Sequence, residues 1–232
     1  MKHIEIAHEI IDYLHLVFPN DSIAIAGSVA DGTFKKNSDI DLLLLSERLK
    51  CSYAVSFLYK GKSISIFVFS KAYIRRNMDK YLYSYHNMPL RYVYSSQCVY
   101  DSGNMLNAIC CEIDDVCLKR QLFKSILSGE IKDHILHLLN RNNLDIIHRK
   151  EVLYFVVNKI VTLFVLKEYS NKVTSKIEGR DPFTLIKKKD AYLYNLLKVC
   201  LPYHGNSLFL MRYYFENYIF CLLYTSPSPR DP

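Results

Sequence analysis

Apolar residues recur at alternating spacings of three and four positions near the start of the chain. The positions are Ile4, Ala7, Ile11, Leu14 and Phe18. This period is typical of one apolar face of an amphipathic helix. Pro19 follows, and proline cannot continue a helix because it lacks a backbone N–H. The pattern predicts a helix that ends at about residue 18.

Short apolar runs bounded by turn residues predict strands in the next part of the chain. The runs cover residues 22–26, 39–46, 53–59, 63–70 and 97–100, with a helix expected over 71–85. Lys60, Gly61 and Lys62 predict a hairpin turn between the third and fourth runs. Helical periodicity then dominates, and helices are expected over 105–128, 131–139, 151–169, 191–200 and 208–220.

This change of pattern predicts an α+β chain of two domains. We expect a small mixed β-sheet with flanking helices over residues 1–103 and an all-α helical domain over residues 104–220. Residues 221–232 lose the helical period and are rich in Ser and Pro. Cys221 to Asp231 resembles the translation of a transposon-type sequencing adapter, so we expect no part of the fold to depend on it. A natural disordered tail is the alternative.

Composition places the chain among ordinary globular proteins. Hydrophobic residues are 50% and charged residues 23% of the sequence, which disfavours collagen-like, disordered and coiled-coil classes. Lys159, Arg212 and Glu216 interrupt the most apolar segments, so we expect no membrane span. Glu5 and Glu9 interrupt the N-terminal segment where a signal peptide would need an apolar stretch, so we expect a cytoplasmic protein.

Neither the cysteines nor the net charge indicates a specific function. Seven cysteines show no CxxC pair and no metal-ligand spacing, and we expect reduced, mostly buried thiols. The net charge of +7 suits phosphate-bearing partners. It does not favour a nucleic-acid partner, because no basic groove with interleaved aromatic residues is evident.

Two short motifs carry candidate chemistry. Gly27 and Ser28 follow a predicted strand directly, and a turn of this kind exposes backbone N–H groups and a hydroxyl that can bind phosphate. Asp39 and Asp41 stand two apart in a predicted strand, so their side chains share one face. Mg²⁺ prefers oxygen ligands and is commonly held by one or two carboxylates together with substrate phosphates.

Together these motifs resemble the nucleotidyltransferase superfamily, which includes DNA polymerase beta and the minimal and antibiotic nucleotidyltransferases. The resemblance is carried by GSVADG at 27–32 followed by SDIDLLLL at 38–45. The eleven-residue separation of Ser28 and Asp39 lies within the range of that family. An isolated Asp-x-Asp pair is a weak signal, whereas the strand, turn, spacing and second strand together are more specific. The resemblance covers about the first hundred residues.

The resemblance implies transfer of a nucleoside monophosphate (NMP) from a nucleoside triphosphate (NTP), ATP among them, to a hydroxyl, with release of pyrophosphate. Gly27 and Ser28 would bind the triphosphate, and the catalytic pair Asp39 and Asp41 would hold Mg²⁺ or Mn²⁺. The acceptor would be a small molecule, such as an aminoglycoside-like compound, or a protein, bound by the helical domain. Lys35 and Lys36 are candidate phosphate contacts, although a pair of solvated loop charges is the more ordinary interpretation.

One position departs from the family pattern. The family usually carries a third carboxylate on the next central strand, and Ser65 stands at the best-matching position of KSISIFVF. A neutral hydroxyl is a poor replacement for an anion that positions a metal and accepts a proton. Candidate substitutes are Asp101, Glu112, Asp114 and Asp115, for each of which a turn or helix carboxylate is the more ordinary interpretation.

The missing acid supports an alternative from a different class. In this alternative the chain is a catalytically weakened nucleotide-binding module that acts in a defence or toxin–antitoxin-type partnership. A polymerase-like enzyme is a third and weaker alternative. Arg141 and His148, with six residues between them, loosely resemble the element of helical ribonuclease domains in which four to six residues separate an Arg from a His, but they fit a polar helix–helix connection better. Lys187 to Lys189 is interpreted as a solvated basic face.

Overall fold

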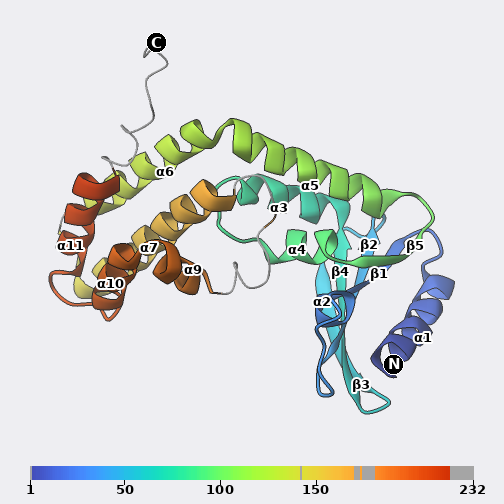
Figure 1. Ribbon diagram of the computed structural model, residues 1–232. Helices are drawn as coiled ribbons and strands as arrows, with labels where there is room; N and C mark the ends of the chain where they lie inside the picture. Colours follow the sequence, from blue (N-terminus) through green and yellow to red (C-terminus); the bar gives the residue numbers. More distant parts are fainter. Residues whose placement is uncertain (1, 142, 170–172, 174–180, 220–232) are drawn as a thin grey trace, which may run out of the picture. The chain divides into compact units, whose positions relative to one another are not determined.

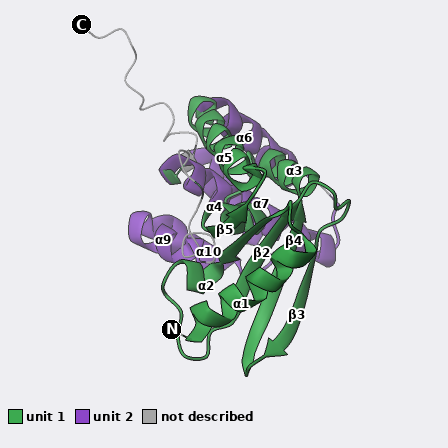
Figure 2. Ribbon diagram, turned by 90° about the vertical axis from the view of Figure 1, so that its right-hand side faces the viewer, with its two compact units in different colours: residues 1–124, 169–179 green, residues 125–168, 180–232 purple. Residues whose placement is uncertain are grey.

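The computed structural model describes residues 2–141, 143–169, 173 and 181–219. The chain forms two compact units (Figure 2). Unit 1 comprises residues 1–124 and 169–179, and unit 2 comprises residues 125–168 and 180–232.

Unit 1 is built on a five-stranded mixed sheet with the strand order β3-β4-β2-β1-β5 (Figure 1). Its central strand β2 (Ile40–Ser46) pairs antiparallel with β1 (Ser22–Ala26) and parallel with β4 (Lys62–Ser70). The edge strands are β3 (Tyr53–Tyr59) and β5 (Gln97–Asp101). All five strands predicted from the sequence are confirmed to within one residue at either end. The α+β fold class is also confirmed.

One face of the sheet is covered by α1 (Lys2–Val17) and by the single turn α2 (Gly27–Ala30). Leu42 and Leu44 of β2 pack there. The predicted helix α1 is confirmed, but its buried face differs from the prediction because Ile4 is 42% exposed. Ala7 and Ile11 are buried as predicted, and Ile6 and Ile10 are buried as well. The buried face therefore overlaps the predicted one and is displaced toward Ile6 and Ile10.

The other face is covered by α3 (Lys71–Tyr81), α4 (Met88–Tyr94) and α5 (Met105–Leu122). Leu43 and Leu45 of β2 pack against these helices. Because both faces of β2 are covered, its sequence is a continuous apolar run instead of an alternation. Burying one such leucine stabilises the fold by about 1.5–3 kcal/mol.

Helix α4 was not predicted, and the predicted helix over 71–85 ends at Tyr81 instead. The start of α4 is fixed by Asn87, whose side-chain oxygen accepts a hydrogen bond from the backbone N–H of Leu90 at 3.1 Å. Pro89 occupies the first turn of α4, where a missing N–H costs nothing. The Asn87 cap and Pro89 therefore mark the start of a second helix that apolar periodicity alone does not predict.

Helix α5 belongs to unit 1, since Ile109, Ile113 and Val116 pack in the core beneath the sheet. The sequence-based boundary after residue 103 thus lies one helix before the division between the compact units. The single helix predicted over 105–128 is also two helices, because the chain leaves α-helical geometry at Phe123, which caps α5. Helix α6 then covers Lys124–Leu139 and includes the helix predicted over 131–139.

Unit 2 is helical. Besides α6 it contains α7 (Ile146–Tyr169), α9 (Pro182–Lys189), α10 (Ala191–Cys200), α11 (Ser207–Tyr214) and a π-helical turn (Phe215–Ile219). Helix α7 begins five residues before the predicted start, because the carboxylate of Asp145 accepts the N–H groups of Ile147 and His148. Helix α9 was not predicted, and its first turn is capped by Asp181.

Three further expectations concern the cysteines, membrane spans and the C-terminal segment. Of the six described cysteines, only Cys117 and Cys200 are buried, so the expectation of mostly buried thiols is wrong. Within the described residues, the helices are too short or too polar to cross a membrane. The adapter-like segment 221–232 lies outside the described residues.

Candidate active site

The two sequence motifs meet at one end of the central strands. In the β1–β2 ladder Ala26 pairs with Asp41. Gly27 follows Ala26 directly, so the Gly27–Ser28 turn lies beside the Asp41 carboxylate. Backbone pairing therefore brings together two motifs that are separated by more than ten residues in the sequence.

Gly27 fits this position for two reasons. Its φ of +64° lies in the left-handed region that residues with a side chain rarely adopt. In addition, a Cβ atom built on Gly27 would lie 2.1 Å from Oδ2 of Asp41 and 3.0 Å from its Cγ. Any side chain here would displace the carboxylate, so glycine is what permits the backbone to approach it.

The turn after Gly27 is closed by backbone hydrogen bonds. The N–H of Asp31 donates to the carbonyl of Gly27 at 3.1 Å, and that of Thr33 donates to the carbonyl of Ser28 at 3.0 Å. The side chain of Gln97 on β5 donates to the carbonyl of Ala30 at 2.8 Å. Ser28 itself is half-buried. Backbone hydrogen bonds and the side chain of Gln97 therefore hold the candidate phosphate turn in place.

The two aspartates have different surroundings. Asp39 is exposed and immediately precedes β2, whereas Asp41 lies within the strand and is only 8% exposed. The loop before Asp39 is tied to helix α1, because Nε2 of His3 donates to the carbonyl of Ser38 at 3.1 Å. The ring of His3 also packs against Phe34, with centroids 4.9 Å apart. These contacts hold the start of the aspartate strand in place.

Tyr92 on α4 is a site residue that sequence reasoning missed. Its hydroxyl donates a hydrogen bond to Oδ2 of Asp41 at 3.1 Å, across 51 positions of sequence. Burial, followed by the nearby Asp41 charge, raises the pKa of Tyr92 to about 12. The phenol therefore keeps its proton and remains a donor at neutral pH. The only sequence signal for it was the start of α4, the Asn87 cap followed by Pro89.

Arg91 stands beside Tyr92 and was also missed. It is 6% exposed, and its guanidinium carbon lies 4.7 Å from the centroid of the Tyr92 ring. This cation–π contact fixes the ring from one side. Phe67 of β4 packs on the ring as well, with centroids 4.7 Å apart. Tyr92 is thus held in the orientation that its hydrogen bond to Asp41 requires.

Ser65 occupies the position next to Asp41 on the parallel strand β4, since the two residues are register partners. Side chains at paired positions of neighbouring strands point to the same face. The Ser65 hydroxyl lies 3.0 Å from the hydroxyl of Ser56 on β3. Among the described residues, three His, Cys, Asp or Glu side chains do not come together in a metal-binding group.

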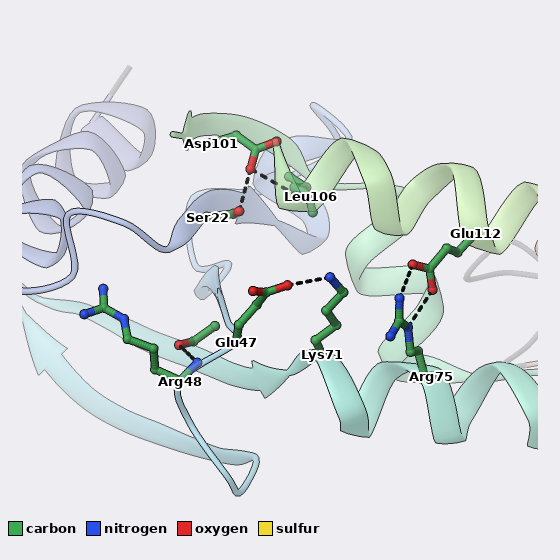
Figure 3. Close-up of polar contacts among 9 residues, drawn as sticks. Ser22, Glu47, Arg48, Lys71, Arg75, Asp101, Leu106 and Glu112 are labelled. Carbon is green, nitrogen blue, oxygen red and sulfur yellow. Dashed lines mark hydrogen bonds and ion pairs between the residues drawn. The ribbon is translucent and has the colours of Figure 1, made fainter. Parts of the chain in front are cut away.

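Two of the candidate substitute carboxylates, Asp101 and Glu112, have partners away from the aspartate pair (Figure 3). Asp101 accepts from the Ser22 hydroxyl at 2.6 Å and from the N–H of Leu106 at 3.1 Å, which caps α5. Ser22 lies at the far end of β1 from Ala26, about 14 Å away at ~3.4 Å per residue. Asp101 therefore belongs to the opposite end of the sheet.

Two of the three candidate carboxylates on α5 also have structural partners. Arg75 donates two hydrogen bonds to Glu112, at 2.9 and 2.6 Å, and lowers the pKa of that carboxyl. Asp114 accepts from the hydroxyl of Tyr94 at 2.7 Å. Asp115 is exposed on the same helix.

The other charged candidates are placed as follows. Lys35 and Lys36 are exposed in the loop before Asp39, and the carbonyl of Lys36 accepts a hydrogen bond from Lys62. In unit 2, His148 contacts Asp145, with Nδ1 2.6 Å from Oδ2. Lys189 lies 3.6 Å from Glu168. None of these contacts involves the aspartate pair.

The donor set suits a hard divalent cation. Asp39 and Asp41 offer carboxylate oxygens. A side chain at position 27 would not fit beside Asp41, because its Cβ atom would overlap the carboxylate. Mg²⁺ accepts such an incomplete protein shell, because it retains water and binds substrate phosphates. The residues present therefore fit Mg²⁺ with two protein carboxylates.

Comparison with known proteins identifies the fold and gives a family match for part of the chain. Residues 7–85 match the family described as a nucleotidyltransferase domain. A crystal structure of a nucleotidyltransferase-like protein from Exiguobacterium sibiricum 255-15 is similar, with a TM-score of 0.51 and 13% sequence identity. The match covers 92% of this chain and 74% of that chain, and at this identity it shows the fold alone. The curated proteins contain no match. The matched residues include the Gly27–Ser28 turn and both aspartates, so the comparison supports the resemblance of this part of the chain to the nucleotidyltransferase superfamily.

Proposed function

We propose that this protein transfers an NMP group from an NTP to a hydroxyl acceptor in the presence of Mg²⁺. The observation that carries the proposal is the close approach of Gly27 to Asp41 within the matched domain. In the proposed reaction the acceptor hydroxyl releases its proton to water and its oxygen bonds to the α-phosphorus. The bond from that phosphorus to the pyrophosphate group breaks, and pyrophosphate leaves with the electron pair of that bond. A small molecule or a protein supplies the hydroxyl.

Each site residue has a role in this proposal. Asp39 and Asp41 would hold Mg²⁺, which when bound neutralises charge on the transferring phosphoryl group. The turn at Gly27 and Ser28 would bind the triphosphate through backbone N–H groups and a hydroxyl. Tyr92 orients the Asp41 carboxylate through its hydrogen bond. Positioning of this kind supplies much of the catalysis in phosphoryl transfer.

A second candidate function follows from Ser65. Because a neutral hydroxyl stands beside Asp41 where the family usually has an acid, the domain would bind an NTP and transfer slowly or not at all. The protein would then act through partners as a nucleotide-binding module. Calorimetry with an NTP and Mg²⁺ separates the two functions, since the module binds without forming pyrophosphate.

The substitution Asp39→Asn tests the proposed transfer. Removing this charge is expected to lower the transfer rate by roughly 100-fold or more, the size typical of removing one group that stabilises transition-state charge. The measurement is the transfer of label from α-³²P-labelled NTPs to a panel of acceptors with Mg²⁺ or Mn²⁺. Asp79→Asn is the matched control, because Asp79 is an exposed carboxylate on α3. Equal rates in wild type and Asp39→Asn would refute the site.

A pair of glycine substitutions tests the approach to Asp41. Both Gly27 and Gly32 have positive φ, +64° and +69°, so alanine at either position should cost about 1–2 kcal/mol of stability. Only at Gly27 does the new Cβ meet the carboxylate, since nothing lies within 4 Å at Gly32. Gly27→Ala should therefore lose transfer activity while Gly32→Ala retains most of it. Thermal unfolding and label transfer are measured on both, and equal activities would contradict the proposed role of the approach.

The substitution Tyr92→Phe tests the hydrogen bond to Asp41. We expect the Mg²⁺ concentration for half-maximal transfer to rise about 10- to 100-fold, as is usual when a partner of a metal ligand is lost. Because the pKa of Tyr92 is about 12, the wild-type phenol donates from neutral pH upward and stops only as pH approaches that value. The difference between the two proteins should thus be constant from neutral to mildly alkaline pH.

Tyr94→Phe is the control for this measurement. Tyr94 lies on the same helix but donates to Asp114 instead of Asp41, and that hydrogen bond raises its pKa to about 12 as well. Its substitution should leave the Mg²⁺ dependence unchanged. If both variants change the Mg²⁺ dependence equally, the effect belongs to α4 as a whole and the role assigned to Tyr92 is wrong.

A further inference from the structure

A cavity of about 260 Å³ lies in unit 2, among the end of α6, the start of α7 and the segment from Tyr203 to α11. Three arginines line it: Arg141, Arg149 and Arg212. They come from three separate parts of the chain, so the fold of unit 2 itself gathers them.

Two of the guanidiniums are held in place by the fold. Nε of Arg149 donates to the carbonyl of Leu144 at 2.7 Å. Nη2 of Arg212 donates to the carbonyl of Leu139 and, at 3.0 Å, to the side-chain oxygen of Asn140. A guanidinium has five N–H donors, so each of these side chains keeps donors that the contacts just named do not use. Arg141 makes no side-chain hydrogen bond to the described residues.

No carboxylate balances these charges inside the cavity. Among the described residues that line it, none is Asp or Glu. The nearest aspartate in sequence, Asp145, is directed to its own helix, where it accepts from the N–H groups of Ile147 and His148 and contacts the His148 ring. Like charges gathered at one place repel one another, and a bound anion removes that cost.

The remaining lining is apolar and aromatic. Tyr203, Leu208 and Phe209 contribute this surface, and Phe209 is 69% exposed although it is a large apolar side chain. Arginine binds phosphate through parallel N–H donors, while aromatic rings stack on planar groups. The volume is below the roughly 300–1,000 Å³ of pockets for drug-sized ligands. Both features fit a small phosphate ester that carries a ring.

We propose that this cavity binds a phosphate monoester of about mononucleotide size, with the phosphate on the three arginines and the ring against Tyr203 and Phe209. Binding at this site is separate from the proposed nucleotidyl transfer and needs neither Mg²⁺ nor the aspartate pair. Arg149 and Arg212 supply pre-oriented donors, and Arg141, in the α6–α7 connection, supplies the third charge.

Calorimetry on the full chain in EDTA, with AMP as the probe, tests the proposal. The variant is Arg141→Gln, which removes one charge and breaks no side-chain hydrogen bond among the described residues. Wild type should bind one AMP, inorganic phosphate should compete with it, and Arg141→Gln should bind about tenfold or more weakly, the usual loss for a hydrogen bond to a charged group. Lys150→Gln is the matched control, because Lys150 is exposed on α7 and does not line the cavity.

Several outcomes would overturn the proposal. One is the absence of saturable AMP binding to wild type, and another is equal weakening by Arg141→Gln and Lys150→Gln, which would show a general charge effect. Binding of a short oligoribonucleotide without binding of AMP would assign the arginines to a nucleic acid. Loss of AMP binding in Asp41→Asn, but not in Arg141→Gln, would place AMP at the aspartate pair; the proposed transfer would then stand while this proposal fell.

Discussion

The candidate site depends on the close approach of the Gly27 backbone to the Asp41 carboxylate. The antiparallel pairing of Ala26 with Asp41 sets this approach, and the absence of a side chain at Gly27 permits it. A slip of one residue in that pairing would turn Asp41 to the opposite face of the sheet, which is packed with apolar side chains. The apolar residues on both faces of β2 therefore fix the position of the acid as well as stabilising the fold.

Tyr92 connects this sheet site to the helical layer. Its hydrogen bond holds one oxygen of Asp41, and the rings and charge around it come from β4 and α4. A buried carboxylate without a donor would be costly, so the tyrosine both stabilises Asp41 in its buried position and orients it. Asp39, exposed at the start of the same strand, has no such requirement. The pair thus combines one fixed and one solvated carboxylate.

The sequence predicted the parts of this arrangement that depend on local pattern. The five strands, the Gly27 turn and the pair of aspartates all follow from spacing and turn residues. The contact between Tyr92 and Asp41 could not be predicted, because it spans 51 residues and depends on a short helix defined by a cap. The roles of Asp101 and Glu112 were equally hidden, since their partners Ser22 and Arg75 lie far away in sequence. The exposed Ile4 shows that helical spacing of apolar residues predicts the presence of a helix more reliably than it predicts which of those residues are buried.

The central claim is that Asp41 belongs to a nucleotidyl-transfer site in which Ser65 occupies the position of the third acid. The most direct measurement compares the NMP transfer rates of wild type, Ser65→Asp and Ser56→Asp at the same Mg²⁺ concentration. Ser56 pairs with Ser65 on the edge strand, so its substitution adds the same charge about 4.8 Å farther from Asp41. We expect faster transfer in Ser65→Asp alone. A rate in Ser65→Asp that is no higher than in wild type or in Ser56→Asp would contradict it.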